Sequence, residues 1–261
     1  MINIKYIQST INEKKYLEAL REIENSFSEA TAFEKIVLYD YQSRIFLELN
    51  KFCSAENCLK NAITLLENED NNHRLYIKFL QSIAFLLARQ NKYEEAINYA
   101  KKELNYVRNK FPNNIVKIEN IIVTIANYYC ELGDFDTAKK LNNDVIKYYT
   151  ENKGRNSLVV SECLNNIGHI LEKEGLKEDS ISFFEEALQI RNELLGVHRD
   201  TAFTLLNLGI VLATLGRYQL ASRHLLEARK MYRALEMEDS QYFSECEKNI
   251  QLCWDAVVTP C

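Results

Sequence analysis

The chain repeats one residue pattern about every 42 positions. In each copy, two apolar residues and a small residue are followed by a turn residue, an aromatic residue and an alanine at fixed distances. A fixed period in this range is the mark of a repeat protein whose units stack on their neighbours. The pattern therefore predicts a solenoid, a fold that presents long surfaces to partners. The small residues of four copies are Ala84, Ala126, Gly168 and Gly209, spaced 42, 42 and 41 residues apart.

One copy shows how a unit is built. Ser161–Lys173 and Lys177–Leu195 each carry apolar residues at helical spacing, and Gly175 between them supplies a turn. Gly168 and Ala187 are expected where the two helices approach most closely, so that a larger side chain would push the helices apart. Because neither helix can bury its apolar stripe alone, these helix hairpins are expected to stack.

The copies resemble the tetratricopeptide repeat over nearly the whole chain. That resemblance implies an all-α fold, a right-handed α-α superhelical solenoid of about six helix hairpins with a C-terminal capping helix. The matching small, turn, aromatic and alanine residues include Ala84, Tyr93, Ala96, Ala126, Gly133, Phe135, Ala138, Gly168, Gly175, Gly209, Gly216, Tyr218, Ala221 and Ala228.

The repeat boundaries follow from the pattern. We expect one continuous solenoid over residues 1–240 and a capping helix and tail over 241–261. The repeats are expected at residues 1–36, 37–77, 78–118, 119–160, 161–201 and 202–240, with connecting loops at Glu67–His73, Asn109–Asn114, Glu151–Asn156, Gly196–Asp200 and Glu236–Ser240.

The repeat is longer than the 34 residues of the common form. Its fourth position carries Leu or Ile where the common form has Trp. These departures, with the segment Ala187–Ala202, resemble the kinesin light chain subtype of the repeat. The resemblance concerns the repeat subtype and not kinesin itself.

Composition narrows the cellular setting. No run of about 18 apolar residues appears, and Met1–Lys5 has no basic region followed by an apolar core, so neither a membrane span nor a secretion signal is predicted. The seven cysteines are scattered and form no zinc-type pair. We expect reduced cysteines in a cytoplasmic protein, and we assign Cys261 no role.

The sequence also argues against catalysis and nucleic-acid binding. The formal net charge of −5 lacks the basic footprint of a nucleic-acid partner. His169 with Glu172 could form an acid–base pair. However, no nucleophile motif, phosphate-cradling loop or carboxylate cluster accompanies them. We therefore expect no enzyme, no catalytic residue, no metal and no cofactor.

Function is expected in the groove that the first helix of each hairpin lines. Its residues are rich in asparagine, and an amide can both donate to and accept from one peptide unit. Apolar residues between them would receive ligand side chains. The alternative is that the asparagines bond neighbouring helix ends. The candidates are Lys78, Gln81, Phe85, Asn120, Val123, Asn127, Asn165, Asn166, His169, Phe203 and Asn207, of which the resemblance implies ligand contact for Asn166 and Asn207.

Two functions fit this surface. One is an adaptor or scaffold that holds a segment of another protein. The other is a peptide-sensing regulator similar to bacterial pheromone receptors, here without its own output domain. The variant of the fold that clamps a terminal carboxylate needs a basic cluster, and Arg44, Lys78 and Arg89 are too dispersed to form one.

The C-terminal segment predicts one amphipathic helix. Its apolar stripe is expected to cover the core of the last repeat around Leu212, Leu225 and Ala228, with Trp254 buried. The rival use of the same face is a homodimer. The stripe consists of Phe243, Cys246, Ile250, Cys253, Trp254 and Val257.

Overall fold

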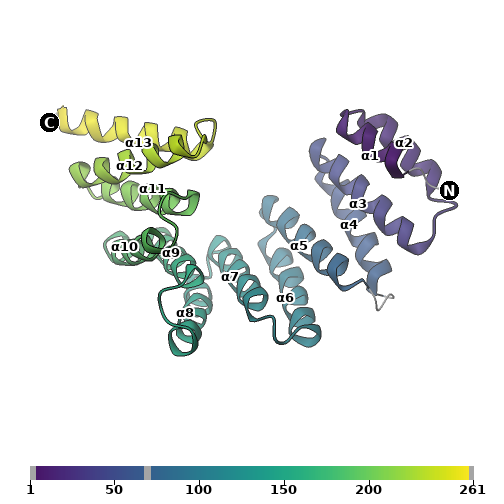
Figure 1. Ribbon diagram of the computed structural model, residues 1–261, viewed down its shortest axis with the longest axis horizontal. Coiled ribbons are helices and arrows are strands. Elements are labelled where there is room, and N and C mark those ends of the chain that lie inside the picture. The colour runs from purple at the N-terminus through teal and green to yellow at the C-terminus, as the bar shows by residue number, and fades with distance from the viewer. Residues whose placement is uncertain (1–3, 68–71, 259–261) are drawn as a thin grey trace. The chain divides into compact units, whose positions relative to one another are not determined.

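The computed structural model describes residues 4–67 and 72–258 (Figure 1). Within these ranges the regular structure consists of thirteen α-helices and no strand, which confirms the all-α fold class of helix hairpins. Cys261 and residues 68–71 of one expected loop lie outside the described residues.

The chain divides into two compact units, Met1–Ile121 and Ile122–Cys261. The division falls within α7 (Ile115–Leu132). In the first unit α1 (Ile4–Asn12) packs on α2, α3 on α4, and α5 on α6. The remaining bounds there are α2 Tyr16–Ser26, α3 Ala32–Glu48, α4 Phe52–Glu67, α5 His73–Arg89 and α6 Tyr93–Lys110.

The second unit continues the same pairing. Here α9 packs on α10 and α11 on α12, while α13 packs on both α11 and α12. Their bounds are α8 Phe135–Asn152, α9 Leu158–Lys173, α10 Lys177–Leu194, α11 Arg199–Thr214, α12 Tyr218–Ala234 and α13 Gln241–Val258. The expected extent of each repeat stays a prediction.

Each helix pair is joined by the same turn. In the pair α9–α10, Gly175 is left-handed, its N–H donates to the Glu172 carbonyl at 3.0 Å, and the Leu176 N–H donates to the Leu171 carbonyl at 2.9 Å. This two-bond pattern is the Schellman motif, which satisfies carbonyls at a helix end. It recurs with left-handed residues at Lys14, Asn50, Asn91, Gly133, Gly175 and Gly216.

The residues at these turns explain why the first repeats match the sequence pattern less well than the later ones. Asn50 and Asn91 occupy the left-handed position without glycine, and asparagine tolerates that conformation better than most residues. Lys14 adopts it as well, at a cost of about 1–3 kcal/mol. Three of the six turns therefore form without the glycine that marks the later repeats.

The close approach expected at Gly168 is confirmed. A Cβ at Gly168 would lie 2.8–3.0 Å from ring atoms of Phe184 on α10, and one at Gly209 would lie 2.6 Å from the Leu225 Cγ on α12. Ala187 is fully buried, but Phe184 is the residue that Gly168 meets. Glycine thus makes room for a large side chain from the second helix.

The apolar stripe of α13 covers the end of the second unit. Cys246, Ile250 and Cys253 are buried in one cluster with Leu212 and Leu225. The expectation that Trp254 is buried is wrong, because its side chain is 47% exposed. Successive helix residues point about 100° apart, so the residue after the buried Cys253 lies beside the stripe. Val257, expected on the stripe, is also exposed.

Two further expectations concern cysteines and membranes. Of the six cysteines in the described part of the chain, all but Cys53 are buried. No helix among the described residues has the length and apolar character needed to cross a bilayer.

We predict that Gly168→Ala and Gly209→Ala each lower the free energy of unfolding by about 1–3 kcal/mol, as overpacking does. This direction is opposite to the roughly 1 kcal/mol by which alanine favours a helix over glycine. Chemical denaturation measures the change. Gln189→Ala, at an exposed site on α10, is the matched surface control. Variants more stable than the parent protein would contradict the close approach.

Removal of residues 241–261 should expose the apolar cluster around Leu212 and Leu225. We expect the shortened protein to aggregate or melt at lower temperature, because large exposed apolar patches associate. Light scattering and thermal melting would measure this. An unchanged melting temperature with no aggregation would show that α13 does not act as a cap. Trp254 fluorescence is no guide here, since the indole is already exposed.

Candidate functional site

The second unit contains a recess of about 450 Å³ between its first helices. Residues of α9 and α11 form most of its lining, and α10, α12 and α13 each contribute one. The lining consists of Leu158, Val159, Ser161, Glu162, Asn165, Asn166, Arg191, Leu195, Arg199, Asp200, Phe203, Tyr232 and Tyr242. We refer to this set as the α9–α11 recess.

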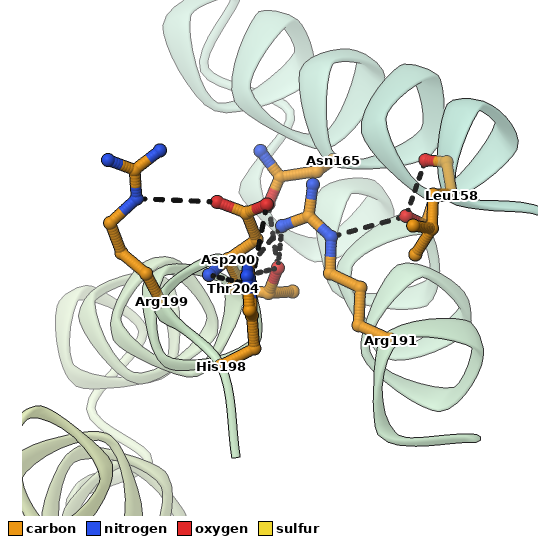
Figure 2. Close-up of polar contacts among 8 residues, drawn as sticks. Leu158, Asn165, Arg191, His198, Arg199, Asp200 and Thr204 are labelled. Atoms are coloured by element: carbon orange, nitrogen blue, oxygen red, sulfur yellow. Dashed lines mark hydrogen bonds and ion pairs between the residues drawn. The ribbon is translucent and has the colours of Figure 1, made fainter. Parts of the chain in front are cut away.

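Arg191 of α10 is the central polar residue of the recess (Figure 2). Only 6% of Arg191 is exposed. Its Nε donates to the Ser161 hydroxyl at 3.2 Å, and its Nη1 donates to the Asp200 backbone carbonyl at 2.8 Å and to the Thr204 hydroxyl. All three acceptors are neutral. Within the described residues the side chain therefore ties α10 to α9 and α11 through neutral acceptors.

A buried amide extends this contact. Asn165 is 5% exposed, and its Oδ1 lies 3.2 Å from the Thr204 hydroxyl and 3.4 Å from the Asn207 Nδ2 that donates to it. The Thr204 hydroxyl has one proton, which it gives either to Asn165 or to the Asp200 carbonyl at 3.1 Å. Asn165 and Asn207 thus bond to each other between the middles of α9 and α11, not at the helix ends that the structural alternative named.

Two acids lie near the guanidinium. The Asp200 carboxylate is 3.6 Å from the Arg199 Nε, on its own helix. Glu162 is exposed as a residue. Desolvation by the surrounding protein nevertheless raises the pKa of its carboxyl, and the charge of Arg191 acts in the opposite direction. Burial lowers the pKa of Arg191, and the charges of Asp200 and Glu162 oppose that effect.

Two polar groups of the recess have no hydrogen-bond partner in the described part of the chain. They are the buried Asn166 Nδ2 and the Tyr232 hydroxyl. Tyr232 is fully buried, and its ring stacks on Tyr242 with centroids 6.3 Å apart. Phe203 meets Tyr242 edge-on at 5.3 Å. Such unpaired groups cost free energy unless something bonds to them.

The structure brings only some of the expected residues together. Asn165, Asn166 and Phe203 line the α9–α11 recess, while Asn127 and His169 are not among its lining residues. The His169 Nδ1 lies 3.6 Å from the Glu172 carboxylate.

Val123 does not line a groove, contrary to expectation. It is 2% exposed and packs in a core cluster with Val160 and Leu164 of α9. The side chains of the neighbouring hairpin therefore cover the position that the repeat pattern assigned to a ligand.

The expected residues of the first unit are not among the lining residues of this recess. Lys78 and Gln81 line a second cavity of about 500 Å³ together with Phe111. Lys78 also forms an ion pair of 2.8 Å with Asp40 of α3. Phe85 is 61% exposed, and Asn120 is exposed near the end of the unit.

Sequence reasoning missed Arg191, Tyr232 and Tyr242. A signal for Arg191 was present, because it follows Phe184 and Ala187 on the inward stripe of α10 at spacings of three and four. An arginine on an apolar stripe is rare unless it has polar partners. Those partners lie 30 and 13 residues away, at Ser161 and Thr204.

Comparison with known proteins agrees with this fold. One curated protein, Protein O-mannosyl-transferase Tmtc3 of Drosophila melanogaster, is 31% identical over 72 residues, which is 28% of this chain and 7% of the transferase. The crystal structure of BtubC (BKLC) from P. vanneervenii has a TM-score of 0.63 at 19% identity, covering 86% of this chain and 92% of that one. NprR in complex with its cognate peptide NprX has a TM-score of 0.61 at 14% identity, covering 98% and 72%.

A family model also matches part of the chain. The tetratricopeptide repeat model matches residues 117–193 and 164–234. These ranges contain α8 to α12 and most of α7. The kinesin light chain subtype and its period stay predictions. The matched residues include the whole lining of the α9–α11 recess except Tyr242.

Proposed function

We propose that this protein is a non-enzymatic interaction module, an adaptor or scaffold that holds a peptide or a segment of another protein on its first helices. The observation that carries the proposal is the pair of unpaired buried polar groups, the Asn166 amide and the Tyr232 hydroxyl, in one recess. Both atoms are shielded from solvent, so a ligand would reach them after a local movement of side chains, and bonding to them would remove the cost of leaving them unpaired.

The recess suits an extended peptide. The Asn166 side chain carries both a donor and an acceptor, so after rotation of its amide it can pair with one peptide unit. Leu158, Val159 and Phe203 supply apolar walls for ligand side chains. Backbone bonds with pockets for side chains are a common basis of peptide recognition.

The same use is proposed for the other expected positions. In the second unit Asn127, His169 and Asn207 would contact residues of the ligand beyond the recess. Taken by itself, the first unit would contact a ligand through Lys78, Gln81, Phe85 and Asn120, with the exposed Phe85 ring as the apolar contact.

A second candidate is a regulator that senses a short free peptide. The likeness of fold to NprR, solved with its cognate peptide, favours this role. The two functions differ in ligand. A regulator binds a free short peptide and responds with a change of conformation, whereas an adaptor binds a segment within a folded partner.

We place the protein in the cytoplasm, with no metal, cofactor, membrane or nucleic-acid partner. The free thiols of Cys53, Cys58, Cys130, Cys246 and Cys253 support a reducing compartment. A homodimer through α13 is a further possibility that the exposed Trp254, Val257 and Leu252 support.

The proposal predicts that affinity selection from a synthetic mixture of random heptapeptides, read by mass spectrometry, enriches defined sequences. Asn166→Ala should weaken binding of an enriched peptide by about 1–2 kcal/mol, or roughly 5- to 30-fold, with little change in stability. Calorimetry measures the affinity. Failure to enrich any peptide above an unrelated helical protein would refute the proposal.

Asn165→Ala tests whether the neighbouring asparagine has a structural role instead. It removes the acceptor that Thr204 and Asn207 share, so we expect it to lower the free energy of unfolding by about 1–2 kcal/mol. Asn166→Ala should cost much less, because its Nδ2 has no partner in the described residues. Equal destabilisation by both changes, measured by denaturation, would show that Asn166 is structural too.

A further inference from the structure

We infer that the α9–α11 recess binds the carboxylate of an aspartate or glutamate side chain within the bound segment, and that Arg191 is the residue that holds it. The inference rests on the proposed function and adds the chemistry of the ligand. It starts from the hydrogen bonds that the guanidinium makes and those it leaves open.

Arg191 retains donors for a ligand. A guanidinium has five N–H groups. Three of them go to Ser161, to the Asp200 carbonyl and to Thr204, all through Nε and Nη1. The two N–H groups of Nη2 have no bond within the described residues, and Figure 2 shows that nitrogen without a dashed line. A carboxylate oxygen is the strongest acceptor that could occupy this position.

Arg191 also has no carboxylate in direct contact among the described residues, although the charges of Asp200 and Glu162 act on it from further away. Among the described residues no carboxylate lies within 4.0 Å of the guanidinium, and its three partners are neutral. The acid beside it, Asp200, turns its backbone carbonyl to Arg191 and its carboxylate toward Arg199. A buried charge without a partner is costly. A ligand carboxylate would supply the missing charge.

Because Arg191 lies deep in the recess, we expect it to bind a carboxylate on a ligand side chain and not the carboxylate at the end of the ligand chain. Arg191 is 6% exposed and comes from α10, while α9 and α11 provide most of the lining above it. A carboxylate on one or two methylene groups can reach the guanidinium while the ligand backbone stays near Asn166. The apolar Leu158, Leu195 and Phe203 can pack against those methylene groups.

The nearby acids restrict the charge that the recess accepts. Glu162 and Asp200 both lie close enough to affect the pKa of Arg191. They would repel a doubly charged phosphate more strongly than a singly charged carboxylate. A neutral amide would leave the guanidinium without a counter-ion. The carboxylate is the acceptor that satisfies both conditions.

The test uses affinity selection from random heptapeptides synthesised once with C-terminal amides and once with free C-termini. We expect both mixtures to yield peptides with Asp or Glu at one fixed position. Replacing that residue by Asn or Gln in an amidated peptide should weaken binding about tenfold or more. Arg191→Gln should remove the preference for acid over amide. Arg223→Gln, an exposed arginine on α12 with the same change in charge, should keep it.

A second variant covers the case in which Arg191→Gln does not fold. Glu162→Gln removes a neighbouring negative charge without touching the hydrogen bonds of Arg191. It should strengthen binding of the acidic peptide by about twofold or more and leave the Asn or Gln peptide unchanged. Circular dichroism and thermal melting show which variants remain folded.

Three results would overturn the inference. Enriched peptides without an acidic position would exclude carboxylate recognition while leaving the proposed function intact. If peptides are enriched for acidic residues only when their C-termini are free, Arg191 would bind the terminal carboxylate of the peptide and not a side chain. No enrichment from either mixture would remove both this inference and the proposed function.

Discussion

The packing of the two helices within each hairpin is the constraint on which the rest of this structure depends. Gly168 leaves space that the Phe184 ring fills, and the Schellman turn at Gly175 sets where the second helix begins. Together these features bring α10 close behind α9. The position of Arg191 beneath the recess follows directly, because its backbone lies seven residues, two turns, beyond Phe184 on the same helix face.

Arg191 then connects this packing to the site. Its hydrogen bonds to Ser161 and to the Asp200 carbonyl join α10 to α9 and α11, the two helices that form most of the lining. A residue that only stabilised the stack could be apolar, since buried charges rarely improve stability over a well-packed apolar residue. An arginine with two N–H groups left open is better explained by recognition of a ligand.

The local features of this fold could be predicted from sequence. The glycine turns and the close approach at Gly168 depend on residues near one another in the chain, and the structure confirms them. Helix ends were less exact, since α9 begins at Leu158 and not at Ser161. Val123 and Trp254 were misplaced because their exposure depends on which neighbouring helix covers them. Arg191 was missed because its partners come from two other helices. The recess could be assigned to the first helices, but its chemistry required the packed structure.

Side-chain NMR of the protein with an affinity-selected acidic peptide tests the central claim most directly. The buried Arg191 Nε–H and the Asn166 side-chain amide are separate reporters within one recess. The account predicts that both signals shift on saturation, and that the Arg191 signal loses its shift when the peptide acid is replaced by an amide. Shifts confined to exposed residues of α10 and α12, with Arg191 and Asn166 unchanged, would contradict it.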